Sequence, residues 1–151
     1  MKNDTYIVRE LCEADLARGF RELLAQLTKT GSASLETWQE RYRFRQQNSA
    51  TYLTLVAVDS TTDRVVGTAT LLIEHKFTRG CGQAGHIEDV VVDAAHRQQQ
   101  LGSRLVRALL DRAQSRYGCY KVTLYCTEEN APFYAKLGLE RKGVQMAHYF
   151  G

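Results

Sequence analysis

Residues 86–103 combine side chains and backbone in a way that suggests chemistry. A strand-like run ends at Val92, a polar stretch follows, and a helical pattern begins near Leu101. A loop of this kind aims several backbone N–H groups at one point, and the N-terminus of the following helix adds a partial positive charge there. Arg97 places a full charge in the same turn. The segment therefore suits a pyrophosphate, although the same spacing also occurs where a loop merely connects a strand to a helix.

Two neighbouring carboxylates, Glu88 and Asp89, lie in the valine-rich strand before this loop. Adjacent residues of a regular strand face opposite sides of the sheet, so both side chains meet on one face only if a β-bulge reorients one of them. Burying carboxylates without a partner is costly. Either the two carboxylates bind a ligand, or one forms a salt bridge and the other contacts solvent.

The rest of the chain must supply the elements that hold this segment. Apolar residues at helical spacing predict one amphipathic helix over residues 13–27, and Ser34 is expected to cap a second helix through Tyr42. The strongest helical pattern begins at Leu101. Strands are expected at residues 6–9, 52–58, 65–74, 86–92, 121–126 and 144–149, with a short helix at 129–137. This order predicts a single domain over residues 1–151, of the α/β class, with a mixed β-sheet and helices on both faces.

Composition narrows the function further. The chain has 151 residues and a net charge of +3, from 20 basic and 17 acidic residues, which is too weak an excess to indicate a nucleic-acid partner. We expect Arg41, Arg43 and Arg45 to point to different sides of a helix and to contact solvent. No apolar run suits a membrane span and the first residues lack a secretory signal, so an intracellular protein is expected. The cysteines and histidines show no metal-ligand spacing, so we expect no metal site.

Several strings resemble those of the GCN5-related N-acetyltransferases. They are His86-Ile-Glu-Asp-Val-Val-Val-Asp93, Arg97-Gln-Gln-Gln-Leu-Gly-Ser103, Tyr117-Gly-Cys-Tyr-Lys-Val-Thr-Leu124 and Asn130-Ala-Pro-Phe-Tyr-Ala-Lys-Leu-Gly138. Within that superfamily the chain is most similar to the glucosamine-6-phosphate N-acetyltransferases, which Leu27-Thr-Lys-Thr-Gly31 and Ile73-Glu-His-Lys-Phe77 also fit. The resemblance implies a splayed sheet, acetyl-CoA as co-substrate, direct acetyl transfer to glucosamine 6-phosphate in a ternary complex, a homodimer, and a role in UDP-N-acetylglucosamine synthesis.

The resemblance also implies how the co-substrate is bound. The backbone of Val90, Val91 and Val92 is expected to bind the pantetheine arm as a pseudo-strand. The pyrophosphate is expected on the amides of the loop and first helical turn, with Arg97 and Ser103 assisting; these amides belong to Gln98, Gln99, Gln100, Leu101, Gly102 and Ser103. The superfamily pattern has glycine where this chain has Gln98 and Gln100, which raises the conformational cost if those positions need positive φ.

The catalytic roles follow from the same resemblance. Tyr134, next to Phe133 in the co-substrate site, is expected to act as general acid toward the departing thiolate, and the backbone amide of Val90 is expected to bind the oxyanion. Asn130 either caps the short helix or bonds the pantetheine. Relatives usually carry Asp or Glu at the position of Tyr125, and a phenol is a poor base near neutral pH. The backbone carbonyl of Tyr125 is therefore expected to accept the amine hydrogen, with water-mediated transfer to Glu88 as the alternative.

The acceptor site is also inferred from the resemblance. Glu88 and Asp89 are expected to orient the sugar, together with Thr28. Relatives often end with arginines that hold the sugar phosphate, but this chain ends His148-Tyr-Phe-Gly151. We expect Lys76 and Arg79 to bind the phosphate instead, and Lys29 and His148 are further candidates. Two other functions remain open: acetylation of a different amine, such as a polyamine or protein terminus, and a non-catalytic CoA-binding module.

Overall fold

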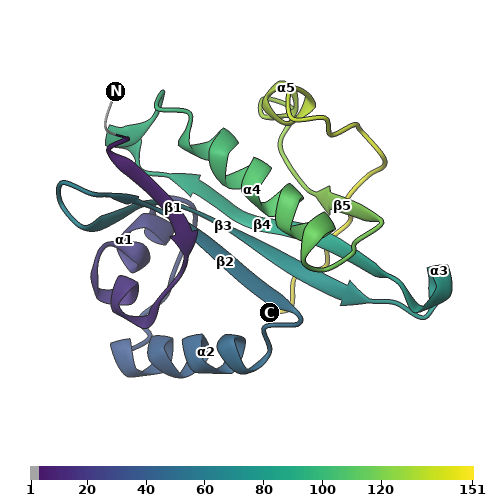
Figure 1. Cartoon of the computed structure of the whole chain (residues 1–151). Coiled ribbons are helices and arrows are strands. Elements are labelled where there is room, and N and C mark those ends of the chain that lie inside the picture. Colours follow the sequence, from purple (N-terminus) through teal and green to yellow (C-terminus); the bar gives the residue numbers. More distant parts are fainter. Residues whose placement is uncertain (1–3) are drawn as a thin grey trace.

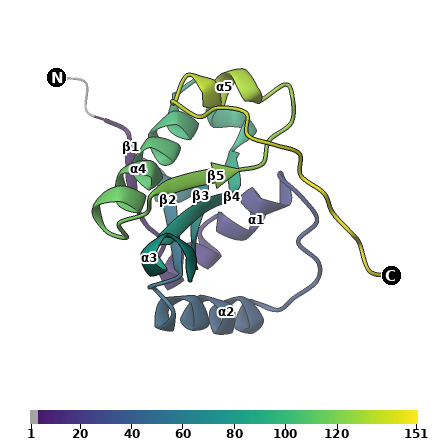
Figure 2. The ribbon, with the colours of Figure 1, turned by 90° about the vertical axis from the view of Figure 1, so that its right-hand side faces the viewer.

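The computed structural model describes residues 4–151. A five-stranded sheet in the order β1-β2-β3-β4-β5 carries α1 and α2 on one face and α4 on the other (Figures 1 and 2). The strands are β1 (Tyr6–Glu10), β2 (Tyr52–Asp59), β3 (Arg64–His75), β4 (Gln83–Val92) and β5 (Lys121–Leu124). The helices are η1 (Glu13–Ala17), α1 (Phe20–Ala25), α2 (Leu35–Gln47), α3 (Thr78–Cys81), η2 (Ala94–His96), α4 (Leu101–Ser115) and α5 (Ala131–Ala135). The expected α/β class with a mixed sheet is confirmed.

The sheet opens between β4 and β5. Neighbouring strands from β1 to β4 are antiparallel, whereas β5 is parallel to β4. Strand β4 has ten residues, but β5 pairs only with its first part, and the last pair is Ile87 with Leu124. From Glu88 onward β4 has no neighbour on this side in the part of the chain that the structure describes. Its backbone groups there are free to bond a ligand, and the expected splay is present.

Two apolar clusters hold the helices against the sheet. On one face, α4 packs against β2, β3 and β4 through side chains that are almost completely buried, among them Leu101, Leu105, Val106, Leu109 and Ala113. On the other face, Leu16, Phe20 and Leu23 of η1 and α1 pack against Val56, Val58, Val65 and Val91. Both faces of the central strands are therefore buried, which explains their near-continuous apolar sequences.

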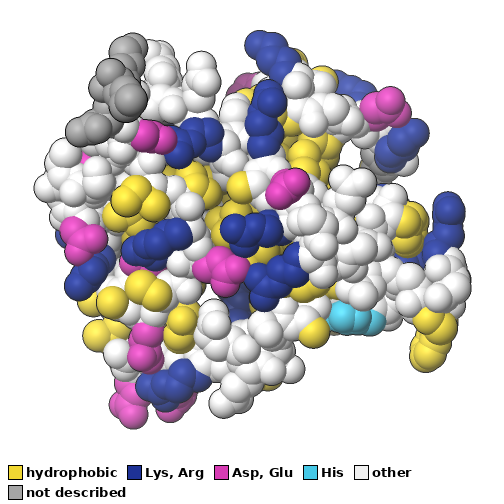
Figure 3. Space-filling model, in the orientation of Figure 1, with side chains coloured by type: hydrophobic (Ala, Val, Ile, Leu, Met, Phe, Trp, Pro, Cys, Tyr) yellow, Lys and Arg dark blue, Asp and Glu magenta, His cyan; other side chains and the backbone are white. Residues whose placement is uncertain are grey.

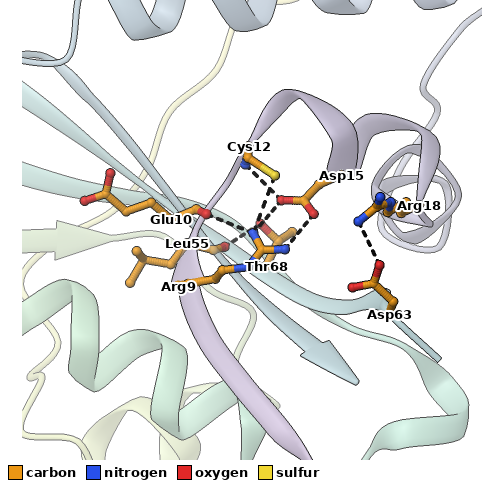
Figure 4. Close-up of polar contacts among 8 residues, drawn as sticks. All are labelled: Arg9, Glu10, Cys12, Asp15, Arg18, Leu55, Asp63 and Thr68. Carbon is orange, nitrogen blue, oxygen red and sulfur yellow. Dashed lines mark hydrogen bonds and ion pairs between the residues drawn. The ribbon is translucent and has the colours of Figure 1, made fainter. Parts of the chain in front are cut away.

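One buried ion pair fastens the segment after β1. Asp15 is 1% exposed and accepts hydrogen bonds from Arg9 Nη1 and Nη2 at 2.7 and 2.8 Å and from the amide of Cys12 at 2.8 Å (Figure 4). Thr68 nearby donates its hydroxyl to the carbonyl of Leu55 at 2.8 Å. Among the residues that the structure describes, no buried side-chain nitrogen or oxygen lacks a hydrogen-bond partner, as buried groups require.

The outer face of α4 is basic, and several of its arginines pair with acidic residues near β1. Arg112 and Arg116 both contact Glu10 of β1, at 3.2 and 2.7 Å, and Arg104 contacts Asp4 at 3.0 Å. Figure 3 shows basic side chains scattered over this face with acidic and apolar ones between them. These exposed pairs add little stability each. They link α4 to β1 and to the residues just before it, at the edge of the sheet opposite β5.

Two expected elements are wrong. Residues 13–27 do not form one helix, because Gly19 adopts a φ of 101° between η1 and α1 and the carbonyl of Arg18 accepts from the amide of Val65. The bend brings the chain onto β3. Residues 144–149 are not a strand, since they lie beside no partner strand in the described part of the chain and leave the body of the molecule as an extended tail (Figure 2).

The cap of α2 gives a first prediction. Ser34 Oγ accepts a hydrogen bond from the amide of Thr37 at 3.2 Å, as expected for an N-cap. Ser34→Ala should lower the free energy of unfolding by about 1 kcal/mol, because that amide loses its acceptor. Urea denaturation measures the loss, with Ser32→Ala as the control on the exposed segment before the helix. Equal stability of the two variants would contradict the capping role.

Candidate functional site

A β-bulge lies where β4 leaves β5. Thr70 of β3 pairs with Glu88, whereas Thr68 pairs with Val91, so two residues of β4, Asp89 and Val90, oppose one residue of β3. Asp89 takes a φ of 52°, which is unusual for a residue other than glycine. The bulge brings Asp89 to the same face of the sheet as Glu88, the face that α2 covers. The opposite orientation expected for a regular strand is therefore wrong, and the bulge alternative is what the structure contains.

Asp89 lies at the rim of a cavity between α2 and the sheet, which we call the α2 cavity. Its lining is part apolar and part polar: Leu11, Leu16, Phe20, Leu24, Trp38, Arg41, Tyr42, Arg45, Gln46, Tyr52, Thr54, Thr68, Thr70 and Asp89. Partial burial and the neighbouring charge of Glu88 raise the pKa of Asp89 above its usual value, and Arg45 opposes the shift. Aromatic rings beside convergent polar groups are typical of small-molecule sites.

Glu88 is half exposed and belongs to a short hydrogen-bonded chain. Its Oε1 lies 3.0 Å from His86 Nε2, and the other ring nitrogen of His86 lies 3.0 Å from Thr123 Oγ1 on β5. The imidazole thus spans the last paired stretch of β4 and β5. It fixes the direction of the Glu88 carboxylate just where the strands part.

The loop after β4 has the backbone that glycine would favour. Gln98 and Gln100 adopt φ values of 68° and 59°, so the expected conformational cost is present at both positions. Gln100 is the N-cap of α4 and gives it no side-chain bond. The amides of Leu101, Gly102 and Ser103 therefore lie in the first turn, where an α-helix provides no acceptor of its own. Together they form a set of donors for an anion.

Three elements converge beside this loop. A Cβ placed on Gly102 would lie 3.4 Å from Phe133 Cζ of α5 and 3.8 Å from Val92 Cγ2 of β4. Phe133 stacks edge-on against Tyr134, with 4.9 Å between ring centroids. Burial, with a smaller contribution from Cys126, raises the pKa of Tyr134 above its ordinary value. The phenol is therefore protonated throughout the neutral range and can donate a proton or hydrogen bond.

Two other expected groups flank the opening. Tyr125 follows the last residue of β5, so Tyr125 and Glu88 are the first residues beyond the pairing of β5 with β4. The Tyr125 side chain is 61% exposed, which leaves its backbone as the part nearest the sheet. Asn130 is the N-cap of α5, but its side chain makes no capping bond. The side chain of Asn130 thus does not cap α5 here, and its bond to the pantetheine stays a prediction.

The structure does not bring the expected phosphate ligands to this opening. Lys76 pairs with Glu74 at 3.1 Å, and Arg79 stacks over Tyr120 at 4.8 Å, both near the tip of the β3–β4 hairpin. Asp89 lies six residues along β4 from Gln83, or about 20 Å at the usual strand rise. Thr28 and Lys29 are exposed after α1, and His148 lies in the tail with its ring against Phe150.

Sequence reasoning missed several residues that the fold gathers here. Arg41 and Arg45 do not point to different sides of α2, because residues four apart share a face, and both line the α2 cavity; only Arg43 turns away, toward Glu13. The sequence predicts His86 only as a strand residue and gives no sign of its contacts with Glu88 and Thr123. Gln26 ties the end of α1 to the start of the loop by bonding Asp93 and the amide of Ala94. Of these features, only the shared face of Arg41 and Arg45 could have been predicted from the sequence, because residues four apart lie on the same side of a helix.

Comparison with known proteins identifies the family to which this geometry belongs. A family model described as the acetyltransferase (GNAT) family matches residues 16–139, which include the bulge, the loop and α5. The chain belongs to the GNAT acetyltransferase family. The GNAT match spans every element around the opening between β4 and β5.

Individual GNAT relatives agree over nearly the whole chain. Glucosamine 6-phosphate N-acetyltransferase of Arabidopsis thaliana is 43% identical over 97% of this chain and 98% of its own length. Glucosamine 6-phosphate N-acetyltransferase 1 of Oryza sativa subsp. japonica is 46% identical over 97% of this chain and 88% of its own. The crystal structure of the Arabidopsis thaliana protein superposes with a TM-score of 0.94, covering 98% of this chain and all of that chain, at 42% identity.

Proposed function

We propose that this chain transfers the acetyl group of acetyl-CoA directly to the amine of glucosamine 6-phosphate, and so supplies N-acetylglucosamine 6-phosphate for UDP-N-acetylglucosamine synthesis. The observation that carries the proposal is the splayed end of β4, which sets two carboxylates beside free main-chain groups. The names of relatives that match nearly the full chain support the choice of acceptor.

The donor side uses the main chain. The free backbone of Val90, Val91 and Val92 would bond the pantetheine arm as an added strand. The amides of Leu101, Gly102 and Ser103 would hold the pyrophosphate, supported by the positive end of α4 and by the backbone of residues 98–100. Arg97 is exposed beside them and adds a full charge. Phe133 and Asn130 border the same opening from α5.

The steps of acetyl transfer are assigned to residues around the opening between β4 and β5. Asp89 and Glu88 orient the sugar. The attacking amine either donates a hydrogen bond to the carbonyl of Tyr125 and loses its proton to solvent, or passes that proton through a water to Glu88. The amide of Val90 donates to the thioester oxygen as negative charge develops there. Tyr134 donates its phenolic proton to the departing sulfur. Much of the rate gain comes from holding both reactants in one orientation.

An amine panel tests the proposal. The protein is mixed with acetyl-CoA and with glucosamine 6-phosphate, glucosamine, spermidine or an N-terminal peptide, and free thiol release is followed. We expect glucosamine 6-phosphate to react far faster than the other amines. A greater rate with spermidine or the peptide would overturn the acceptor assignment, and binding of CoA without any turnover would indicate a binding module instead.

A charge at the first turn of α4 tests the pyrophosphate site. Ser103→Asp should raise the Kd for CoA about tenfold or more, because the carboxylate repels the pyrophosphate across a partly desolvated site. A carboxylate in the first turn interacts favourably with the dipole of α4, so Ser103→Asp should not lower the melting temperature. Isothermal titration with CoA measures the change, and Ser103→Ala, which keeps the local charge, is the matched control. Unchanged affinity in Ser103→Asp would place the pyrophosphate elsewhere.

We extend the proposal to a homodimer in which the tail docks on a second copy of the chain. Four tail side chains, Val144, Met146, Tyr149 and Phe150, are 89–91% exposed, a cost that a second copy would remove. The outer edge of β5, which within residues 4–151 pairs with β4 alone, offers a matching surface. Light scattering should give a dimer for residues 1–151 and a monomer for residues 1–143. A monomer in both would refute it.

No helix among residues 4–151 is long and apolar enough to cross a membrane. The intracellular location stays a prediction.

A further inference from the structure

We infer that His96 is a positioning residue for the pyrophosphate of CoA. Its protonated ring bridges Asp59, the last residue of β2, and Asp93, the first residue after β4, and so fixes the start of the loop that leads into α4. The inference rests on the proposed function, which assigns the pyrophosphate to this loop. His96 acts through the backbone of the loop and not by a contact of its own with CoA.

The imidazole of His96 reaches across the sheet from the end of β4 to the end of β2. Its Nδ1 lies 3.4 Å from Asp93 Oδ2, and its Nε2 lies 3.5 Å from Asp59 Oδ2. Strand β3 separates β2 from β4, so the ring links two segments that do not pair with each other. The three side chains are largely shielded from solvent, with exposed fractions of 24% for His96, 10% for Asp59 and 26% for Asp93.

Each of the two carboxylates presents one oxygen to the ring, because its other oxygen is already bonded. Asp59 Oδ1 accepts hydrogen bonds from the amide and the hydroxyl of Thr61, at 2.9 and 2.6 Å. Asp93 Oδ1 accepts from the amide of Ala95 and from Nε2 of Gln26, both at 3.3 Å. These bonds orient both carboxylates, and the two Oδ2 atoms face the imidazole.

Both carboxylates are ionised at neutral pH. The bonds from Thr61 lower the pKa of Asp59 below its ordinary value, and His96 adds to this shift. In Asp93 burial acts in the opposite direction, but the bonds from its donors, His96 among them, outweigh it and lower the pKa. Within residues 4–151 neither carboxylate pairs with a lysine or arginine, so His96 is the one basic side chain that bridges them.

This arrangement fits the protonated form of the ring. A neutral imidazole carries one N–H and would turn a lone pair toward the second carboxylate, whereas an imidazolium donates to both. Tyr6 of β1 packs edge-on against the ring, with 6.0 Å between centroids. Arg64 of β3 and Glu22 of α1, which have opposite charges, line the small cavity that His96 and Asp93 also border.

The loop after His96 has a backbone that must be held in place. Gln98 and Gln100 take positive φ values, which residues other than glycine adopt at a conformational cost. The end of the loop is held by α4, where the carbonyl of Gln100 accepts from the amide of Arg104 at 3.1 Å. The start is held by the bridge and by the amide of His96, which donates to the carbonyl of Asp93 at 2.8 Å. Loss of the bridge would therefore let the loop relax and misalign the amides that bind the pyrophosphate.

The charge on the bridge gives a test by pH. Imidazole ordinarily titrates between pH 5 and 8, so the bridge should be complete in mild acid and weaken as the pH rises. Isothermal titration with dephospho-CoA measures the Kd, because this ligand lacks the phosphate monoester of CoA, a group that itself titrates near pH 6. Between about pH 5.5 and 7.5 the Kd of the unmodified protein should rise about fivefold, as for the loss of one hydrogen bond. A Kd that stays constant or falls over this range would overturn the inference.

Variants at both ends of the bridge identify the source of the pH dependence. His96→Gln removes the charge, so its Kd should be weak and nearly constant over the whole range. Asp59→Asn keeps an acceptor for Thr61 and offers an N–H to the neutral ring, so it should also flatten the profile while the contact persists. His75→Gln makes the same substitution at the other end of β3 and should keep the unmodified profile. A profile in His96→Gln or Asp59→Asn that is as steep as that of the unmodified protein would overturn the inference.

Turnover distinguishes this inference from the proposed function. His96→Gln should raise the KM for acetyl-CoA and leave kcat and the KM for the amine within about twofold, since the reacting groups are untouched. A lowered kcat with an unchanged KM for acetyl-CoA would overturn the inference. Turnover of glucosamine 6-phosphate with a pH profile that does not depend on His96 would overturn the inference and keep the proposed function. A profile that depends on His96, in a protein that acetylates another amine only, would overturn the assigned acceptor and keep the inference.

Discussion

Replacing Tyr134 with phenylalanine is expected to lower kcat about a hundredfold while the protein keeps its stability. In the proposed mechanism the phenol supplies the proton for the departing sulfur, and a positioned acid contributes a rate factor of about this size. Burial holds the pKa of the phenol above its ordinary value, so the acid form persists at neutral pH. The measurement is thiol release at saturating acetyl-CoA and acceptor.

Phenylalanine keeps the edge-on contact between the rings of residues 133 and 134. Packing should therefore survive, and thermal unfolding checks that it does. Tyr125→Phe is the matched control, because the Tyr125 side chain is largely exposed and only its backbone is assigned a role. Full activity in Tyr134→Phe would remove the phenol from the mechanism, and a large loss in Tyr125→Phe would point to a side-chain role there.

Replacing Asp15 with alanine is expected to destabilise the fold by about 3 kcal/mol. Removing one member of a buried pair typically costs 3–5 kcal/mol, and the low end applies because the Arg9 side chain is 36% exposed and regains water. The amide of Cys12 also loses its acceptor. Urea denaturation at neutral pH measures the difference, with Asp63→Ala, which breaks the exposed pair with Arg18, as the control.

The Asp15 pair also predicts a pH dependence. Burial alone would raise the pKa of Asp15, but the bonds from Arg9 and Cys12 outweigh it and hold the pKa below its usual value. A lowered pKa in the folded state means that the stabilisation is complete above the unfolded pKa of about 3.9 and is lost as the pH falls through the folded value. The stability gap between the unmodified protein and Asp15→Ala should thus be constant near neutral pH and narrow below about pH 4. A gap that widens in acid would contradict this assignment.

The sequence predicted those parts of the fold whose signals are local. Helix α4 could be read from its apolar repeat beginning at Leu101, because that repeat is buried along its whole length. The cap at Ser34 and the loop that needs positive φ were likewise predictable from residue types. The segment around Gly19 was not, since its break depends on a contact with Val65 of a distant strand.

The candidate site residues also divide into those with a local sequence signal and those that only the fold brings together. Tyr134 and Val90 could be proposed from recognisable strings, and the structure places both at the edge of one opening. Arg45 has no such string, and only the folded chain brings it near Tyr52 and Asp89. The pattern at residues 144–149 alternates as a strand does, but alternation specifies a strand only where a neighbour supplies the hydrogen bonds.

The β-bulge adds one residue to β4, and this residue determines which face of the sheet each later side chain of the strand occupies. Side chains alternate along a strand with period two, so removing that residue would invert every position after it. Val91, which now packs with Phe20 and Val58, would turn toward α4, and Val90 and Val92 would exchange sides with it. The number of residues in β4 therefore determines which of its side chains face α4 and which face α1 and α2, and neither face can change without the other.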